Sequence, residues 1–278
     1  MLPTGPSLAL SPWIRAKGLM AAFPCMNDDT LLLTRDTSQV LDQTLKPIPL
    51  ALDDDTRRVI TQAQRLPDGG IALAHARARL GEPNVLTFEP SGVSRFSFPV
   101  GDGVHQFAVD RQGRFWVGYF DEGIYGEDPL SGQGLGAFSP DGTPWFGLRD
   151  DAPDAPHIDD CYALTLDSAD RAWFCAYHTF ELGYVAERNY RRITTDPIAP
   201  GAKGLIVSDR HVAYIGSYDT PDAAIVFDPQ TWETRVIPIT TDRGRPLNLS
   251  SVMCRGDLAL CVDAEGVFRF TLTDLLRL

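Results

Sequence analysis

The chain has 278 residues, of which 44% are hydrophobic, and a formal net charge of -12 at pH 7. A chain of this size can bury a large core, and its acidic surface repels phosphate backbones and anionic headgroups, so we expect neither nucleic acid nor a membrane as a partner. The segment from Met1 to Leu10 has no basic stretch followed by an apolar run, so no signal peptide is predicted and the expected location is the cytoplasm.

A short motif recurs along the chain: an apolar segment, a tight polar turn, and a second apolar or aromatic segment. Its clearest copy runs from Phe107 to Tyr119. The turn centres lie about 40 to 57 residues apart, a period typical of the four-stranded blades of a β-propeller. These centres are Asp28, Gly69, Gly113, Asp170, Arg210 and Gly256.

In chain order, residues 8–15 form an apolar segment ahead of the first repeat, and a weak hairpin at 38–50 completes that repeat. The segment from Asp53 to Gln64 is a candidate helix, although its β-branched residues suit a strand equally well. Later repeats contain a second hairpin with proline at the first turn corner, where proline fixes φ and removes a donor that the turn does not need. These turns are Phe88 to Gly92, Phe138 to Gly142 and Phe227 to Thr231. Each repeat is therefore expected to contain four strands.

The sixth repeat supplies strands at 251–254, 258–262 and 267–272, one fewer than the expected four. We expect residues 8–15 to supply the missing outer strand, because pairing the two ends of the chain would close the ring and remove sheet edges. The predicted fold is all-β: one six-bladed β-propeller domain over residues 1–278, with four-stranded antiparallel blades, closed by the N-terminal strand.

The starts of first strands and the ends of second strands lie on the same side of an antiparallel meander. Residues at these positions should meet at one mouth of the ring, where acidic groups outnumber basic ones. We predict the binding site there, beside the two longest inserted loops, 121–133 and 149–160. The predicted site residues are Asp121, Glu122, Asp160, His105, His178, Tyr218, Lys203 and Asn248.

Carboxylates gathered in one concavity either raise one another's pKa or hold a cation, so a divalent ion, Ca²⁺ or Mg²⁺, is a candidate cofactor. The alternative is structural, because an acidic residue followed by glycine, as at Glu122, commonly just ends a strand. The two loops are likewise either functional or tolerated insertions.

Cysteine usage indicates a reducing environment. The five cysteines form an odd set without a C-x-x-C pair, and each lies in a strand-like apolar segment. We therefore predict five buried free thiols and no disulfide.

Two functions remain open. The chain has no H-E-x-x-H, no G-x-S-x-G and no Walker loop, which leaves catalytic residues unassigned. One function is a binding module whose central mouth takes a small molecule, peptide or protein. The other is a metal-assisted hydrolase or lyase that acts on a polar small substrate.

Some segments resemble known propeller repeats. Asp110 to Gly118 resembles repeats of two-component-regulator, NHL and SMP-30/gluconolactonase propellers, and Phe138 to Gly142 resembles the S-P-D-G turn of the last group. The resemblance implies the propeller fold; in the gluconolactonase group a divalent ion in the central mouth serves lactone hydrolysis. This chain lacks that group's early glutamate-proline-tryptophan segment and its asparagine-glycine motif, so no metal ligand is carried over. Tyr119 to Gly123 and Asp160 to Leu164 resemble segments of uncharacterised bacterial propellers, which implies no activity.

Overall fold

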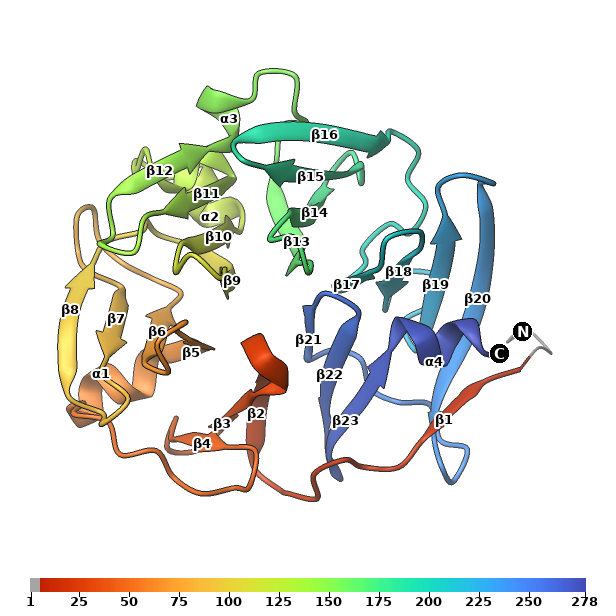
Figure 1. The fold of residues 1–278 in the computed structure, drawn as a ribbon, viewed down its shortest axis with the longest axis horizontal. Helices are drawn as coiled ribbons and strands as arrows, with labels where there is room; N and C mark the ends of the chain where they lie inside the picture. The colour runs from red at the N-terminus through yellow and green to blue at the C-terminus, as the bar shows by residue number, and fades with distance from the viewer. Residues whose placement is uncertain (1–5) are drawn as a thin grey trace.

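The computed structural model describes residues 6–278 and shows six sheets arranged in a ring around a central axis, a six-bladed β-propeller (Figure 1). Each of the six predicted turn centres lies between the first two strands of one blade, so the predicted fold class and blade number are confirmed. The first strand of each blade lies innermost. The inner strands are β2 (Leu19–Pro24), β5 (Ile60–Arg65), β9 (Val104–Val109), β13 (Asp160–Leu166), β17 (Gly204–Val207) and β21 (Val252–Arg255).

The second and third strands complete the antiparallel meander of each blade. The second strands are β3 (Thr30–Thr34), β6 (Ile71–His75), β10 (Phe115–Tyr119), β14 (Ala172–Tyr177), β18 (Val212–Ile215) and β22 (Leu258–Asp263). The third strands are β4 (Val40–Asp42), β7 (Val85–Phe88), β11 (Leu135–Phe138), β15 (Leu182–Ala186), β19 (Ala223–Asp228) and β23 (Gly266–Thr271).

Outer fourth strands occur in the second to fifth blades, so the first and sixth blades have three strands where four were expected. The outer strands are β8 (Ser94–Phe98), β12 (Pro144–Gly147), β16 (Asn189–Thr194) and β20 (Glu233–Thr241). In the first blade the chain that follows β4 makes only one bridge, between Leu41 and Pro47. Proline offers no backbone donor, which limits further pairing at this edge.

Helical segments are short, and none in residues 6–278 is long and apolar enough to cross a membrane. The ambiguous stretch from Asp53 to Gln64 contains both elements. The side chain of Asp53 caps α1 by accepting a hydrogen bond from the backbone N–H of Thr56 at 2.8 Å, and β5 follows directly at Ile60. The helices are α1 (Asp54–Val59), α2 (Asp121–Ile124), α3 (Leu148–Asp151) and α4 (Leu272–Leu276), with 3₁₀ turns η1 (Met26–Asp28) and η2 (Ser131–Gln133).

A buried aspartate stabilises the turn of the third blade. Asp110 is 0% exposed and accepts hydrogen bonds from the Arg114 guanidinium at 2.6 Å and the Trp116 indole at 3.1 Å. The next blade repeats the arrangement, with Asp167 accepting from Arg171 at 2.5 Å and Trp173 at 2.8 Å. The repeat signature around Asp110 therefore specifies a hydrogen-bonded turn, which explains why it marks blades rather than an activity.

The N-terminal segment closes the ring differently from the expectation. Strand β1 (Leu8–Leu10) pairs in parallel with β20 of the fifth blade, not with the sixth blade. The segment then continues along the sixth blade, where Ile14 bridges antiparallel to Val267 of β23. A side chain on Gly266, whose φ is 138°, would collide with the carbonyl oxygen of Ile14. Residues 8–14, here called the strap, thus join the fifth and sixth blades before the chain enters the first (Figure 1).

The five cysteines are free thiols, as predicted, but only four are buried, because Cys254 is half-buried. Cys25 lies one residue beyond β2, and the other four lie on strands. Burial raises the pKa of Cys25 to about 11 and those of Cys175, Cys254 and Cys261 to about 12. These thiols are therefore protonated and unreactive near neutral pH.

Candidate functional site

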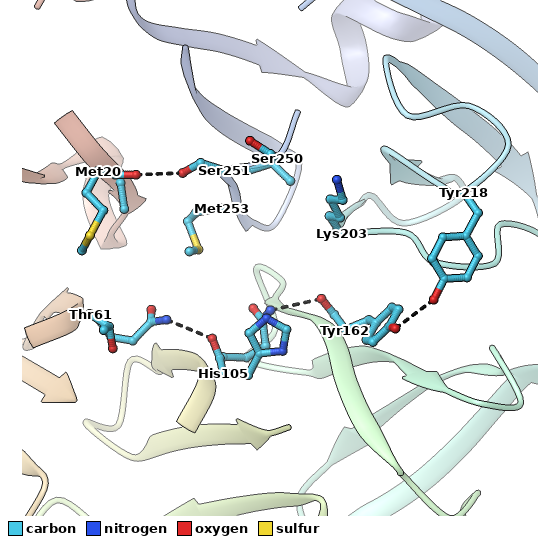
Figure 2. A pocket seen from close by; sticks show the side chains of 14 residues that line it. Met20, Thr61, His105, Tyr162, Lys203, Tyr218, Ser250, Ser251 and Met253 are labelled. Atoms are coloured by element: carbon cyan, nitrogen blue, oxygen red, sulfur yellow. Dashed lines mark hydrogen bonds between the residues drawn. The ribbon is translucent and has the colours of Figure 1, made fainter. Parts of the chain in front are cut away.

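Four inner strands carry a β-bulge at the same position. In blades one to four, the register with the second strand skips one residue of the inner strand: Met20, Thr61, His105 and Tyr162 respectively. A bulge leaves the extra residue unpaired and re-aims its side chain. All four of these residues line one cavity at the mouth of the ring (Figure 2).

This central cavity has a volume of about 520 Å³ and receives residues from all six blades. The fifth blade contributes Gly201, Lys203 and Tyr218, and the sixth contributes the segment from Ser250 to Met253. The ring of Tyr218 packs against Gly201, where φ is +77° and a Cβ would collide with the ring. The volume lies within the usual range for small-molecule sites.

Two glutamines hold neighbouring inner strands together beneath the bulges. Gln62 donates a hydrogen bond to the backbone carbonyl of His105 at 2.9 Å, and Gln106 donates to that of Tyr162 at 3.1 Å. Each bond joins the inner strand of one blade to a bulge residue of the next. The side chains that line the cavity are therefore fixed to a rigid ring rather than to mobile loops.

His105 faces the cavity in an oriented position. Its Nδ1 lies 3.1 Å from Oδ1 of Asp160, and its ring meets that of Phe120 edge-on. The histidine side chain is 44% exposed and the aspartate side chain 19% exposed. A carboxylate that holds one imidazole nitrogen leaves Nε2 available, which is the arrangement of a general base.

An aromatic cluster forms the wall beside Lys203. The hydroxyls of Tyr162 and Tyr218 lie 2.8 Å apart, and the Tyr162 ring stacks on that of Tyr177. Phe180 meets both Tyr162 and Tyr218 edge-on. Burial, together with the hydrogen bond to Tyr218, raises the pKa of the Tyr162 phenol. The Tyr162 hydroxyl therefore keeps its proton near neutral pH.

The predicted site residues are brought together only in part. His105, Lys203 and Tyr218 line the cavity, and Asp160 contacts it through His105. The other four predicted residues do not line it. They are Asp121, Glu122, His178 and Asn248.

These four residues have other surroundings. Glu122 pairs with Arg77 at 2.9 Å, and Asp121 begins α2. His178 lies 3.1 Å from Asp159. The backbone N–H of Asn248 donates to Asp263.

The acidic residues expected at the mouth do not line the cavity. Several carboxylates near this end of the ring are paired with arginine, as where Arg245 contacts both Asp263 at 3.0 Å and Glu265 at 3.1 Å, whereas Asp159 and Asp160 contact histidines. Burial would raise the pKa of Asp263, but the hydrogen bonds from Arg245 and nearby backbone N–H groups lower it overall. No carboxylate is among the residues that line the cavity.

The residues that line the cavity do not fit the expected divalent cation. Within residues 6–278, no group of three or more histidine, cysteine, aspartate or glutamate side chains is arranged to hold a metal ion. Proteins bind Ca²⁺ and Mg²⁺ mainly through carboxylates, with water completing the coordination. Among the described residues no carboxylate lines the cavity, and Asp160 beside it is paired with His105.

The sequence held a signal for the bulge residues that was not used. Met20, Thr61, His105 and Tyr162 each lie eight positions before the turn centre of their repeat. Of these four, only His105 is among the predicted site residues, because it lies at the start of an inner strand. The constant offset from the turn identifies all four.

Comparison with known proteins establishes the fold alone. No protein-family model and no curated protein matches the chain in sequence. A gluconolactonase from Xanthomonas campestris aligns over 97% of this chain and 98% of its own, with a TM-score of 0.59 and 11% identity. A virginiamycin B lyase from Staphylococcus aureus aligns over 95% of this chain and 98% of its own, with a TM-score of 0.55 and 12% identity.

A third similar structure is the PQQ-bound aldose sugar dehydrogenase from Streptomyces coelicolor. It aligns over 94% of this chain and 95% of its own, with a TM-score of 0.55 and 10% identity. The resemblance to gluconolactonase propellers is thus confirmed at the level of fold. Related propellers carry unrelated chemistries, so activity has to be argued from the site.

Proposed function

We propose that this protein binds a small organic molecule in the central cavity. The observation that carries the proposal is the β-bulge repeated in four inner strands, each of which turns one side chain into the same space. A bulge interrupts ladder hydrogen bonds, and bulges are enriched beside functional sites. Four bulges that converge on one cavity are explained by a ligand better than by packing.

A small molecule fits this site better than a peptide or protein partner. The cavity of about 520 Å³ is lined by residues of all six blades, most of them on the inner strands or in the loops that lead into these strands. Such a space encloses a compact ligand, whereas a folded partner would contact only the rim. A protein that docks on the rim loops is the alternative outcome of the test below.

A hydrolase or lyase is the second candidate, and the oriented His105–Asp160 pair favours it. His105 could take a proton from a bound substrate through Nε2 while Asp160 stabilises the resulting imidazolium. This role uses only residues of the chain. If the ligand is converted, His105→Gln should abolish conversion and leave binding within a few-fold.

The binding proposal is tested by retention of a small molecule. The protein is incubated with a deproteinised small-molecule extract and washed, and the mass of the intact protein with any retained ligand is measured by native mass spectrometry. The expected result is an added mass below about 1 kDa on the parent protein, and none on Met253→Trp, whose larger side chain fills the cavity.

Met26→Trp is the matched control, because Met26 lies in η1 at the opposite end of the ring. It should retain the added mass. Loss of the mass in both variants, equal retention in both, or no mass on the parent would each contradict the proposal.

We also propose that the protein works in the cytoplasm. The five free thiols support a reducing compartment.

A further inference from the structure

We propose that the ligand of the central cavity is an organic monoanion, a carboxylate on an apolar or aromatic body, with Lys203 as its counter-ion. This inference rests on the function proposed above and names the ligand class for that site.

The charge of the cavity is opposite to that of the protein. The chain has 37 acidic residues and a net charge of -12, yet among the described residues that line the cavity there is no carboxylate, and Lys203 supplies the only permanent formal charge. Within residues 6–278, no carboxylate oxygen lies within 4.0 Å of the Lys203 ammonium nitrogen. The nearby Asp160 is engaged by His105. A positive group left unpaired in so acidic a protein is therefore available to an anion.

Neutral donors beside Lys203 suit a carboxylate. The hydroxyls of Tyr162 and Tyr218 share one hydrogen between them, which leaves the second phenolic hydrogen for a ligand. One positive charge with neutral donors matches a monoanion, whereas a phosphate dianion usually receives arginine or several cations.

The two sides of the cavity differ in polarity. Lys203, Tyr162 and Tyr218 lie together on one side, and Met20 and Met253 lie on the other (Figure 2). Methionine side chains are polarizable and adapt to apolar and aromatic surfaces. The arrangement fits a ligand whose carboxylate faces the lysine and whose apolar body contacts the methionines.

The test uses three probes that share a phenyl ring: phenylacetate, the neutral phenylacetamide and the cationic phenethylamine. Each is titrated to about 10 mM, a range that reports binding of a few kcal/mol, into protein labelled with ¹³C at the methionine methyl groups. Met20 and Met253 report on the cavity, and Met26 at the opposite end of the ring is an internal control. We expect phenylacetate to shift the Met20 and Met253 signals and leave that of Met26 in place.

Lys203→Gln should weaken phenylacetate binding about five- to tenfold, somewhat less than a buried hydrogen bond to a charged group would give, because the lysine is solvent-exposed. Binding of phenylacetamide should change less than about twofold. Lys46→Gln, at an exposed position in the first blade, should leave all three probes unchanged.

The outcomes separate the two proposals. If phenylacetamide or phenethylamine shifts Met20 and Met253 as strongly as phenylacetate, the cavity binds ligands but the anion inference is wrong. If Lys203→Gln leaves the phenylacetate affinity unchanged, Lys203 is not the counter-ion and the inference also fails. If no probe shifts either methionine, the anion inference is overturned, whereas the binding proposal is decided by the retained mass.

Discussion

The buried carboxylate of Asp110 allows a quantitative test of what stabilises the blades. Besides Arg114 and Trp116, it accepts backbone hydrogen bonds from Gln112 at 3.0 Å and from Arg114 at 2.9 Å. The substitution Asp110→Ala removes the acceptor of four donors at once. The Arg114 side chain is only 12% exposed, so its charge would remain largely buried without a counter-ion.

The expected cost follows from these contacts. Breaking a buried ion pair by removing one partner costs about 3–5 kcal/mol, and an orphaned buried indole N–H costs about 1–3 kcal/mol more. The two costs are not fully additive, because Arg114 and Trp116 bond the same carboxylate. Arg114 also keeps its contact with Trp145, with the guanidinium 4.2 Å from the ring centre, which lowers the cost further. We expect Asp110→Ala to lower the free energy of unfolding by about 4 kcal/mol.

Asp167→Ala should lower the free energy of unfolding less than Asp110→Ala, because the side chain of its partner Arg171 is 30% exposed and can be hydrated. A loss of about 2–3 kcal/mol is expected there. Asp141→Ala is the surface control, because Asp141 is exposed and bonds only Thr143 of its own turn; about 1 kcal/mol or less is expected.

Urea unfolding followed by circular dichroism measures all three losses. If Asp110→Ala does not fold, Asp110→Asn, which keeps one oxygen acceptor, gives a milder reading of the same contacts. The reasoning is refuted if Asp167→Ala costs more than Asp110→Ala, or if both cost no more than Asp141→Ala.

Three further predictions concern the ring, the thiols and acid. Deletion of residues 1–16 should lower the unfolding free energy by about 3–5 kcal/mol, because it removes the buried Ile14 and the strap's hydrogen bonds; an unchanged thermal midpoint would contradict this. An aromatic disulfide reagent at pH 8 should modify no cysteine in the native protein and five after denaturation, and rapid native labelling would show that the thiols are not buried as described. The folded pKa of Asp263 lies below its usual value of 3.8, so its pairing with Arg245 stabilises the protein above about pH 4 and is lost as the pH falls through the folded pKa. Arg245→Gln should therefore reduce the loss of stability between about pH 4 and pH 2, and an identical acid profile would argue against the pair.

The fold could be predicted because its signals are local. Each turn centre lies within a few residues of the strands it joins, and the Asp110 turn closes through residues no more than six positions away. The outermost pairing could not be predicted in the same way. Strand β1 pairs with β20, more than 200 positions later, and an apolar triplet does not specify which of two neighbouring edges it will join.

The sequence predicts where the candidate site lies on the ring, but not which charged side chains face it. Inner-strand starts do meet at one mouth, and His105 and Lys203, which lie at such starts, line the cavity. Whether an acidic residue faces that mouth depends on its distant partner, as where Arg77 engages Glu122 from 45 positions earlier. For partners so far apart in the sequence, no local pattern distinguishes a paired carboxylate from a free one.

The strap also sets an order for folding during synthesis. Ser11 bonds Asp242, a residue made 231 positions later, and Ile14 pairs with Val267 later still. Strand β1 is made before its partner and cannot pair until the fifth blade has been synthesised. The ring therefore closes only after the fifth and sixth blades have been made, and translation that stops in the fourth blade leaves an open arc with β1 unpaired.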